Sequence, residues 1–319
     1  MDFELDKNVY DRFKKIVSSC MNNDNYELEV RIGKYINDTV FIPGIEYNIF
    51  KKILEELYAN SNFKNLENFE ILTIGVSNGD TKLLKCAKYK KNIKKLCHNE
   101  KFINEDIYFL KKTKKLDLLD IQEYNLRIER SSEEALESSM QNEIINNKQK
   151  FYRYKQRYSF ESMDKNFKID LSVTKNSPNF EDFKQGVLGY GGFVESNILN
   201  KPNNFEIEIE YLPNTDLSGK TKEQKLDKLT TNFLNNINFI LKYVQNTEFP
   251  MPKSTNSHIL RKYTESFLMN EGNKTTIHSL PVTRKNYFLG ADTCVLKSEN
   301  LVKKEDVEHE HNYLGDTHP

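Results

Sequence analysis

Two segments far apart in the chain place several carboxylates at alternating positions. "YELEVRIG" carries Glu27 and Glu29, and "NFEIEIEYL" carries Glu206, Glu208 and Glu210. Because a strand alternates its side chains between two faces, the acids of each segment share one face. Carboxylates held this close repel one another, and some stay protonated unless a countercharge is present. A hard divalent cation supplies that charge, and Mg²⁺ or Mn²⁺ suits ligation by carboxylates alone.

A basic segment lies between the two acidic ones. "FYRYKQRYSF" places Arg153, Lys155 and Arg157 on one strand face, and "FKIDLSVTK" adds Lys168 and Asp170. Cationic side chains do not bind a metal, but they suit the non-bridging oxygens of a phosphate. A carboxylate-bound metal beside a basic cradle is suited to phosphoryl transfer, in which charge on the transferred group must be stabilised. Each motif alone is common, and their order along the chain is the stronger signal.

The same bias recurs on a further strand, where Arg127, Glu129 and Glu133 share a face. For a single strand, the simplest interpretation is that the apolar residues face the core and the charges face water. Repetition across several strands favours a closed barrel with a charged lumen, in which the apolar residues pack outward against helices. We therefore expect a tunnel for a charged ligand.

The elements that must position these residues are mainly strands. Apolar spacing predicts helices over 7–20 and 222–245, and a third that begins near Pro43 and carries Ile45 to Leu57. Asn78-Gly79 indicates a hairpin turn. Strands are expected over 26–35, 69–76, 81–89, 106–114, 122–130, 150–160, 167–175 and 205–212. The fold class is α+β, mainly β, with a strand meander that closes as an antiparallel barrel and helices packed outside it.

Composition bounds the remaining possibilities. With 319 residues the chain has room for one large domain or two ordinary ones, and 47 basic residues cancel 47 acidic ones. The neutral total argues against a bulk polyanion binder but leaves a local basic site open. There is no apolar run long enough for a membrane span and no secretory signal, so no membrane partner is expected. Four scattered cysteines suit a reducing compartment and argue against zinc.

The segments "YELEVRIG", "YNLRIERSSEE", "FYRYKQRYSF", "FKIDLSVTK" and "FEIEIEYL" together resemble the triphosphate tunnel metalloenzymes. Within that family the chain is most similar to the metal-dependent RNA 5′-triphosphatases that begin mRNA capping in fungi, protozoa and large DNA viruses. The resemblance covers roughly residues 10–245. It implies a closed eight-stranded antiparallel tunnel, Mg²⁺ or Mn²⁺ as cofactor, and removal of the γ-phosphate from 5′-triphosphate RNA. It also implies hydrolysis of free nucleoside triphosphates, often best with manganese.

The resemblance also assigns site residues. The implied metal ligands are Glu27, Glu29, Glu206, Glu208 and Glu210, and which two of the last three touch metal is open. The implied phosphate-binding residues are Lys112, Arg127, Arg153, Lys155, Arg157 and Lys168. The implied catalytic residues are Glu133, Glu208, Arg127, Lys155, Arg157 and Asp170, with either Glu133 or Glu208 positioning the attacking water. Glu134 competes with Glu133, and Lys111 and Lys114 compete with Lys112. The family's arginine after the first hairpin is missing, so Lys85 or Lys88 replaces it or the assumed register is wrong.

We expect a tunnel domain over 1–248 and, over 249–319, a linker with a poorly ordered extension. "HSLPVTRKNYF" (278–288) resembles the segment before the transferase domain of fused viral capping enzymes, but no K-x-D-G motif is present. We therefore expect no guanylyltransferase activity, and a guanylyltransferase or methyltransferase as a capping partner. The expected location is the cytoplasm, with nucleus or virion as the other options. The alternatives are a tunnel enzyme acting on inorganic triphosphate, thiamine triphosphate or polyphosphate, and a non-catalytic RNA-binding subunit of a capping complex.

Overall fold

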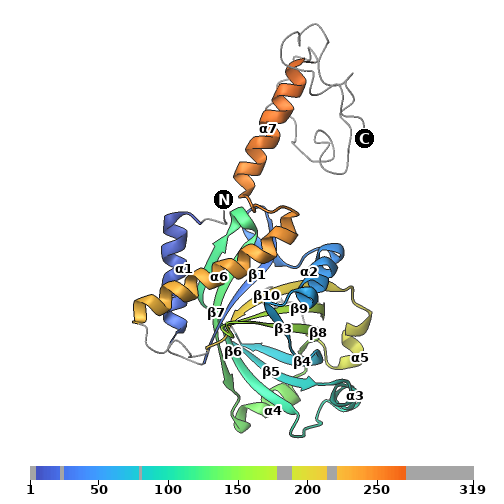
Figure 1. Cartoon of the computed structure of the whole chain (residues 1–319). Coiled ribbons are helices and arrows are strands. Elements are labelled where there is room, and N and C mark those ends of the chain that lie inside the picture. Colours follow the sequence, from blue (N-terminus) through green and yellow to red (C-terminus); the bar gives the residue numbers. More distant parts are fainter. Residues whose placement is uncertain (1–4, 22–24, 79–80, 178–188, 214–220, 271–319) are drawn as a thin grey trace. The chain divides into compact units, whose positions relative to one another are not determined.

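A computed structural model describes residues 5–21, 25–78, 81–177, 189–213 and 221–270 of the chain (Figure 1). The chain divides into two compact units, Met1–Pro250 and Met251–Pro319. The first unit contains the strands and most of the helices. In the second, the structure describes one helix, α7 (Lys253–Asn270).

Eight of the described strands form a closed antiparallel barrel. They are β1 (Tyr26–Ile36), β4 (Phe69–Asn78), β5 (Thr81–Lys88), β6 (Ile107–Ile121), β7 (Leu126–Ala135), β8 (Phe151–Ser162), β9 (Phe167–Asn176) and β10 (Asn204–Tyr211). Their order is β10-β9-β8-β4-β5-β6-β7-β1, and β1 pairs back with β10 so that Arg31 lies opposite Glu208. The closed eight-stranded barrel expected from the sequence is confirmed.

Helices cover the outside of this barrel (Figure 1). The helices α1 (Lys7–Cys20), α2 (Tyr47–Ala59) and α6 (Lys222–Gln245) share one apolar core with β1, β7, β9 and β10. A second core joins α3 (Lys90–His98) and α4 (Ser138–Asn146) to β4, β5 and β6. Short elements complete the first unit: β2 (Val40–Pro43) extends β1, β3 (Phe63–Asn65) pairs with β8, and α5 (Phe193–Ser196) precedes a 3₁₀ turn (Ile198–Asn200).

The barrel reverses the usual arrangement of a half-exposed strand. Leu28, Val30 and Ile32 of β1 are fully buried, and they belong to the core beneath α1 and α6. Their charged alternates therefore face the lumen, because neighbouring residues of a strand point to opposite faces. Burial of apolar side chains contributes roughly 25 cal/mol per Å², so this outer core holds the strands that carry the site. The inversion expected from the sequence is observed.

Helix ends follow local sequence signals. Thr221 caps α6, and Thr221 and Gln224 exchange side-chain and backbone hydrogen bonds in a capping box. Asp6 accepts a hydrogen bond from the backbone of Asn8 at the start of α1. The helices expected over 7–20 and 222–245 are both confirmed with these bounds.

Several elements differ from expectation. Gln122–Tyr124 forms a 3₁₀ turn, because Asn125 takes a left-handed backbone conformation, and β7 begins only at Leu126. Residues 90–98, for which no helix was expected, form α3, and its Ile93 and Leu96 pack into the second core. Helix α7 occupies part of the expected linker. The 278–288 segment lies outside the described residues. None of the described helices is long and apolar enough to cross a membrane.

Candidate active site

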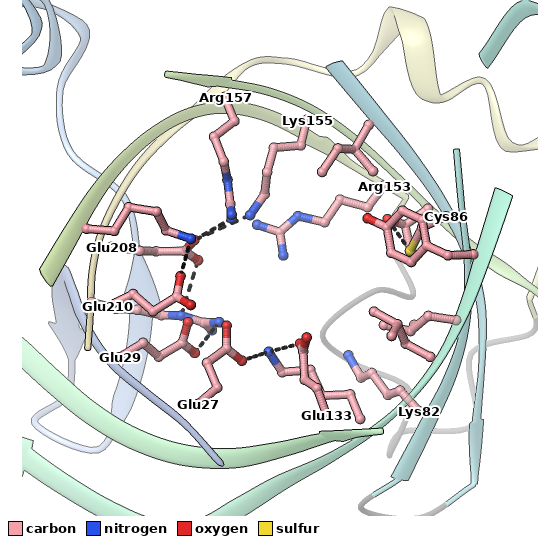
Figure 2. A pocket seen from close by; sticks show the side chains of 18 residues that line it. Glu27, Glu29, Lys82, Cys86, Glu133, Arg153, Lys155, Arg157, Glu208 and Glu210 are labelled. Carbon is pink, nitrogen blue, oxygen red and sulfur yellow. Dashed lines mark hydrogen bonds and ion pairs between the residues drawn. The ribbon is translucent and has the colours of Figure 1, made fainter. Parts of the chain in front are cut away.

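The lumen of the barrel contains a cavity of about 260 Å³. Eighteen side chains line it, and all barrel strands except β7 and β9 contribute at least two of them (Figure 2). Figure 2 shows Arg153, Lys155 and Arg157 entering from one side, with Glu27, Glu29, Glu208 and Glu210 gathered on a neighbouring side. The structure thus brings the acidic and basic motifs of the sequence together in one cavity.

The acidic side of the cavity comes from two paired strands, β1 and β10. Glu29 lies opposite Glu210 across this pair, and Glu27 and Glu208 occupy neighbouring positions on the same face. Together these four residues form the acidic wall. Each has a cation beside it: Arg31 Nη2 lies 2.5 Å from Glu29 Oε1, and Lys168 Nζ lies 2.6 Å from Glu210 Oε2.

The basic row, which is Arg153, Lys155 and Arg157 of β8, lies beside this acidic wall. Arg157 donates from Nη2 to Glu208 Oε2 at 2.9 Å, and Lys155 Nζ lies 3.4 Å from the same oxygen. Burial, together with the neighbouring Arg157 and Arg153, lowers the pKa of Lys155 to about 8, although Glu208 opposes that shift. Lys155 therefore carries the least secure charge of the row, and an incoming anion would stabilise it.

Asp170 lies behind the basic row and does not line the cavity. It is fully buried, accepts a 2.6 Å hydrogen bond from Ser159 Oγ, and has Arg157 Nη1 at 2.7 Å and Lys168 Nζ at 3.4 Å. One carboxylate thus fixes two cations that point into the lumen. The geometry makes Asp170 a positioning residue for Arg157 and Lys168.

Glu206 also lies outside the cavity lining. One of its carboxylate oxygens pairs with Arg153 Nη2 at 2.5 Å. The other accepts hydrogen bonds from Thr174 Oγ1 at 2.7 Å and Asn204 Nδ2 at 3.1 Å. Of the three glutamates of β10, only Glu208 and Glu210 therefore present their carboxylates to the cavity.

Lys112 links Glu27 of the acidic wall to Glu133 of β7. Its ammonium contacts Glu27 and lies 2.8 Å from Glu133 Oε1, while Ser131 Oγ donates to Glu27 at 3.1 Å. Glu133 is 36% exposed at its side chain, far more than the glutamates around it. Two of the competing residues of the sequence interpretation, Lys111 and Glu134, lie opposite each other on β6 and β7 and do not line the cavity.

Arg127, expected to act on phosphate, does not line the cavity either. Its guanidinium makes two hydrogen bonds to Asp120, at 2.7 and 2.9 Å, and lies over the ring of Phe41 at 4.8 Å. Tyr35 donates to the same carboxylate at 2.9 Å. Arg127 shares the lumen face of β7 with Glu133 but occupies the opposite end of that strand.

Three further residues belong to the lumen although the sequence did not single them out as site residues. Arg31 bridges Glu29 and Glu208, the latter at 3.4 Å, and its signal was its position two residues after Glu29. Lys82 lines the cavity from β5, whereas Lys85, one of the two candidates on that strand, is buried and donates to the backbone oxygen of Glu100 outside the barrel. Glu129 lies opposite Glu29, is 4% exposed, and its Oε1 accepts no hydrogen bond among the described residues.

The acidic wall is unevenly compensated. Burial raises the pKa of Glu29 to about 7, and although Arg31 opposes that rise, Glu27 reinforces it. Burial also raises the pKa of Glu210 despite the neighbouring Lys168. Glu27 instead has a pKa near 2, because Lys112 outweighs its burial, and Glu208 stays well below its usual range through Lys155, Arg31 and Arg157. The wall is therefore short of positive charge at Glu29 and Glu210.

These residues fit a divalent cation by their chemistry. Within the described residues, no three Asp, Glu, His or Cys side chains are already gathered as a metal-binding group. However, Glu27, Glu29, Glu208 and Glu210 supply hard oxygen donors to one cavity. The buried Glu29 Oε1 lies 2.5 Å from Arg31 Nη2 but accepts no well-aligned hydrogen bond among the described residues. Carboxylates of this kind are the ligands that Mg²⁺ and Mn²⁺ take in proteins.

No protein-family model and no curated protein match this sequence. Among solved structures, the mimivirus capping enzyme triphosphatase matches with a TM-score of 0.51 and 19% identity, over 75% of this chain and 99% of the viral one. The RNA triphosphatase domain of a trifunctional mimivirus mRNA capping enzyme gives 0.51 and 20%, over 75% and 100%. The S. pombe Pct1 RNA triphosphatase gives 0.48 and 12%, over 78% and 95%. The mimivirus matches show that this chain has the same tunnel fold.

Proposed function

We propose that this chain is a metal-dependent RNA 5′-triphosphatase that removes the γ-phosphate of 5′-triphosphate RNA and also hydrolyses nucleoside triphosphates. The observation that carries the proposal is that the basic row of Arg153, Lys155 and Arg157 lies beside the acidic wall in one cavity. The fold shared with the mimivirus capping enzyme triphosphatase supports it.

The reaction is an in-line displacement by water. A bond forms between the water oxygen and the γ-phosphorus, and the bond to the β–γ bridging oxygen breaks, so that its electron pair passes to the β-phosphate. The products are inorganic phosphate and a diphosphate RNA end. The protein's main contribution is to stabilise negative charge on the transferred group, and the side chains of Arg153, Lys155 and Arg157 are placed to do so.

Mg²⁺ or Mn²⁺ would be held by Glu27, Glu29, Glu208 and Glu210. When bound, such an ion neutralises phosphate charge and polarises the phosphoryl oxygens. Lys112 and Lys168, which pair with Glu27 and Glu210, would then be available to bind the phosphates of the substrate.

Glu133 is the better candidate for positioning the attacking water. Glu208 is surrounded by Lys155, Arg31 and Arg157, which hold its pKa well below the usual range, so it accepts a proton poorly. Within the part of the chain that the structure describes, Glu133 forms an ion pair with Lys112 alone, and its side chain is the most exposed of the glutamates that line the cavity. A carboxylate in that position can accept a hydrogen bond from water while Lys112 holds it in place.

The decisive experiment measures γ-phosphate release from 5′-triphosphate RNA with Mg²⁺ or Mn²⁺. We expect metal-dependent release by the wild-type chain and at least a hundredfold loss in Glu29→Ala. Glu55→Ala on the exposed face of α2 is the matched control, since Glu55 is exposed and forms a surface ion pair with Lys51. Release without metal, or full activity of Glu29→Ala, would overturn the mechanism.

The diphosphate end is the substrate that a guanylyltransferase requires, so we place this activity first in cap formation, before a guanylyltransferase in the same or a separate polypeptide. The second candidate keeps the cavity but takes inorganic tripolyphosphate, since the same basic row suits any chain of phosphates. Comparison of phosphate release from RNA and from tripolyphosphate separates the two. A non-catalytic RNA-binding role instead predicts no phosphate release and no divalent cation bound.

A further inference from the structure

One part of the cavity lining consists of uncharged side chains, between the basic row and the lysines Lys82 of β5 and Lys112 of β6. Three neighbouring strands, β4, β5 and β6, each contribute two uncharged side chains to the lining; they are Ile71, Thr73, Leu84, Cys86, Tyr108 and Leu110. We call this set the uncharged wall. Burial raises the pKa of the Cys86 thiol to about 11, so this residue too is neutral at physiological pH.

The members of the uncharged wall form a continuous surface. Cys86 lies opposite Thr73 on one side and Tyr108 on the other, and Leu84 lies opposite Leu110. The thiol of Cys86 lies 3.6 Å from Thr73 Oγ1 and is also hydrogen-bonded to the Tyr108 hydroxyl. Because these polar atoms bond to one another, the wall presents mainly methyl groups and an aromatic ring to the cavity.

The uncharged wall adjoins the basic row directly. β4 pairs with β8 so that Ile71 lies opposite Lys155 and Thr73 opposite Arg153. A ligand whose phosphates lie on the basic row therefore has its next atoms within reach of hydrocarbon. Phosphate gains nothing from such a surface, whereas an apolar group is stabilised there because its surface is removed from water.

The rim beside this wall has aromatic rings and a lysine. Lys88 Nζ lies 4.6 Å from the ring centre of Phe69 and 6.0 Å from that of Tyr108. Phe69 lies opposite Arg157, and Lys88 lies opposite Ile71, so the rim continues the same strand face one position further along. Aromatic rings beside a cation are the usual means of holding bases and backbone phosphates of single-stranded nucleic acid.

We propose that the uncharged wall binds the sugar and base next to the α-phosphate, so that the tunnel selects nucleotide-linked triphosphates over inorganic tripolyphosphate. This inference rests on the function proposed above and narrows its substrate class. The basic row binds the phosphates in either case, and the wall supplies the discrimination because only a nucleotide has an apolar part to place there.

The test compares kcat/KM for GTP with kcat/KM for inorganic tripolyphosphate in the presence of Mn²⁺. We expect the wild type to prefer GTP and the ratio to fall about tenfold in Leu84→Asn and Leu110→Asn, the loss expected from one apolar contact. Leu116→Asn is the matched control, because Leu116 lies on the same strand as Leu110 but is exposed outside the cavity. A wild type that prefers tripolyphosphate, or a ratio that is equal in all variants, would overturn the inference.

A series of ligands for the wild type keeps the test independent of protein folding and of catalysis. Affinities of tripolyphosphate, methyl triphosphate and a non-hydrolysable GTP analogue, measured by calorimetry with Mn²⁺, should increase in that order. Equal affinities would refute the uncharged wall as a binding surface. Binding of the series in this order without any phosphate release would refute the proposed hydrolysis and leave the inference standing.

Discussion

Replacement of Asp170 by Asn tests whether a buried carboxylate orients the cationic side chains of Arg157 and Lys168 toward the cavity. Asn keeps the volume of Asp170 and can still accept the hydrogen bond from Ser159, but it removes the charge that holds Arg157 at 2.7 Å and Lys168 at 3.4 Å. Breaking a buried ion pair on one side typically costs about 3–5 kcal/mol. Here both cations keep a second partner, Glu208 at 2.9 Å and Glu210 at 2.6 Å, so we expect a loss of about 1–3 kcal/mol.

The activity of Asp170→Asn should fall more than its stability suggests. Arg157 without its inner partner can turn toward Glu208, which takes its guanidinium away from the phosphate position. We expect kcat to fall about tenfold to a hundredfold in the γ-phosphate release assay, in line with loss of a positioned charge at a transition state. A Tm lower by a few degrees accompanies this loss in a domain of such size.

A double-mutant cycle separates positioning from general destabilisation. Asp170→Asn and Arg157→Gln should couple by about 1–2 kcal/mol in chemical unfolding, because each removes the other's partner. Asp117→Asn with Arg130→Gln is the control cycle: that pair is 2.7 Å apart on the outside of the barrel, with Asp117 39% exposed, and should couple by less than about 1 kcal/mol. Additivity of the Asp170 and Arg157 changes, or full activity of Asp170→Asn, would refute the reasoning.

Three other changes have defined outcomes. Lys112→Met removes the cation that competes with a metal ion for Glu27, so it should tighten Mn²⁺ binding severalfold as measured by calorimetry. It should also lower kcat/KM. Weaker Mn²⁺ binding in this variant would contradict the prediction. Glu133→Gln should lower kcat more than it raises KM in single-turnover assays, and an unchanged kcat would exclude Glu133 as the residue that positions water. Burial lowers the pKa of Lys85 to about 8, so the folded state releases this proton before the unfolded chain does, and wild-type stability gains as pH rises from 8 to about 10.4. Lys85→Met lacks this gain, so its Tm relative to wild type should be highest near pH 7 and decline by pH 10. A difference that does not change with pH would refute a lowered pKa of Lys85.

Period-two alternation explains what could be predicted from the sequence. It placed Glu27 and Glu29 on one face of β1 and Arg153, Lys155 and Arg157 on one face of β8, and the structure shows both faces in the lumen. The apolar alternates of β1 required a cover, and the helical spacing in 7–20 and 222–245 supplied it. Short stretches of sequence therefore predicted which strand face enters the lumen, the order of the acidic and basic strands, and the helices that cover the barrel.

Depth along the tunnel was not encoded in the same way. Arg127 and Glu133 share a strand face, yet one is paired with Asp120 at the end of the strand and the other reaches the cavity. Glu208 lines the cavity and Glu206 does not, although both lie on the same face of β10. Their positions depend on the register between β10 and β1, and these two strands are far apart in the sequence. A shift of one residue in the assumed strand register would move Lys82 from the lumen to the outer face. The lysines of β5 that face the lumen could therefore not be identified from the sequence alone.

The cavity is almost self-neutralised, and this has a consequence for the order of binding. Lys112 and Lys168 hold Glu27 and Glu210, so neither the acids nor the cations of these pairs are available separately. A divalent cation that takes the acids releases both ammonium groups, and phosphate that takes the ammonium groups releases the acids. Each ligand thus lowers the cost of binding the other, which is positive coupling between metal and substrate. Because coupling of binding free energies is reciprocal, the nucleotide should tighten Mn²⁺ binding by the same factor by which Mn²⁺ tightens nucleotide binding.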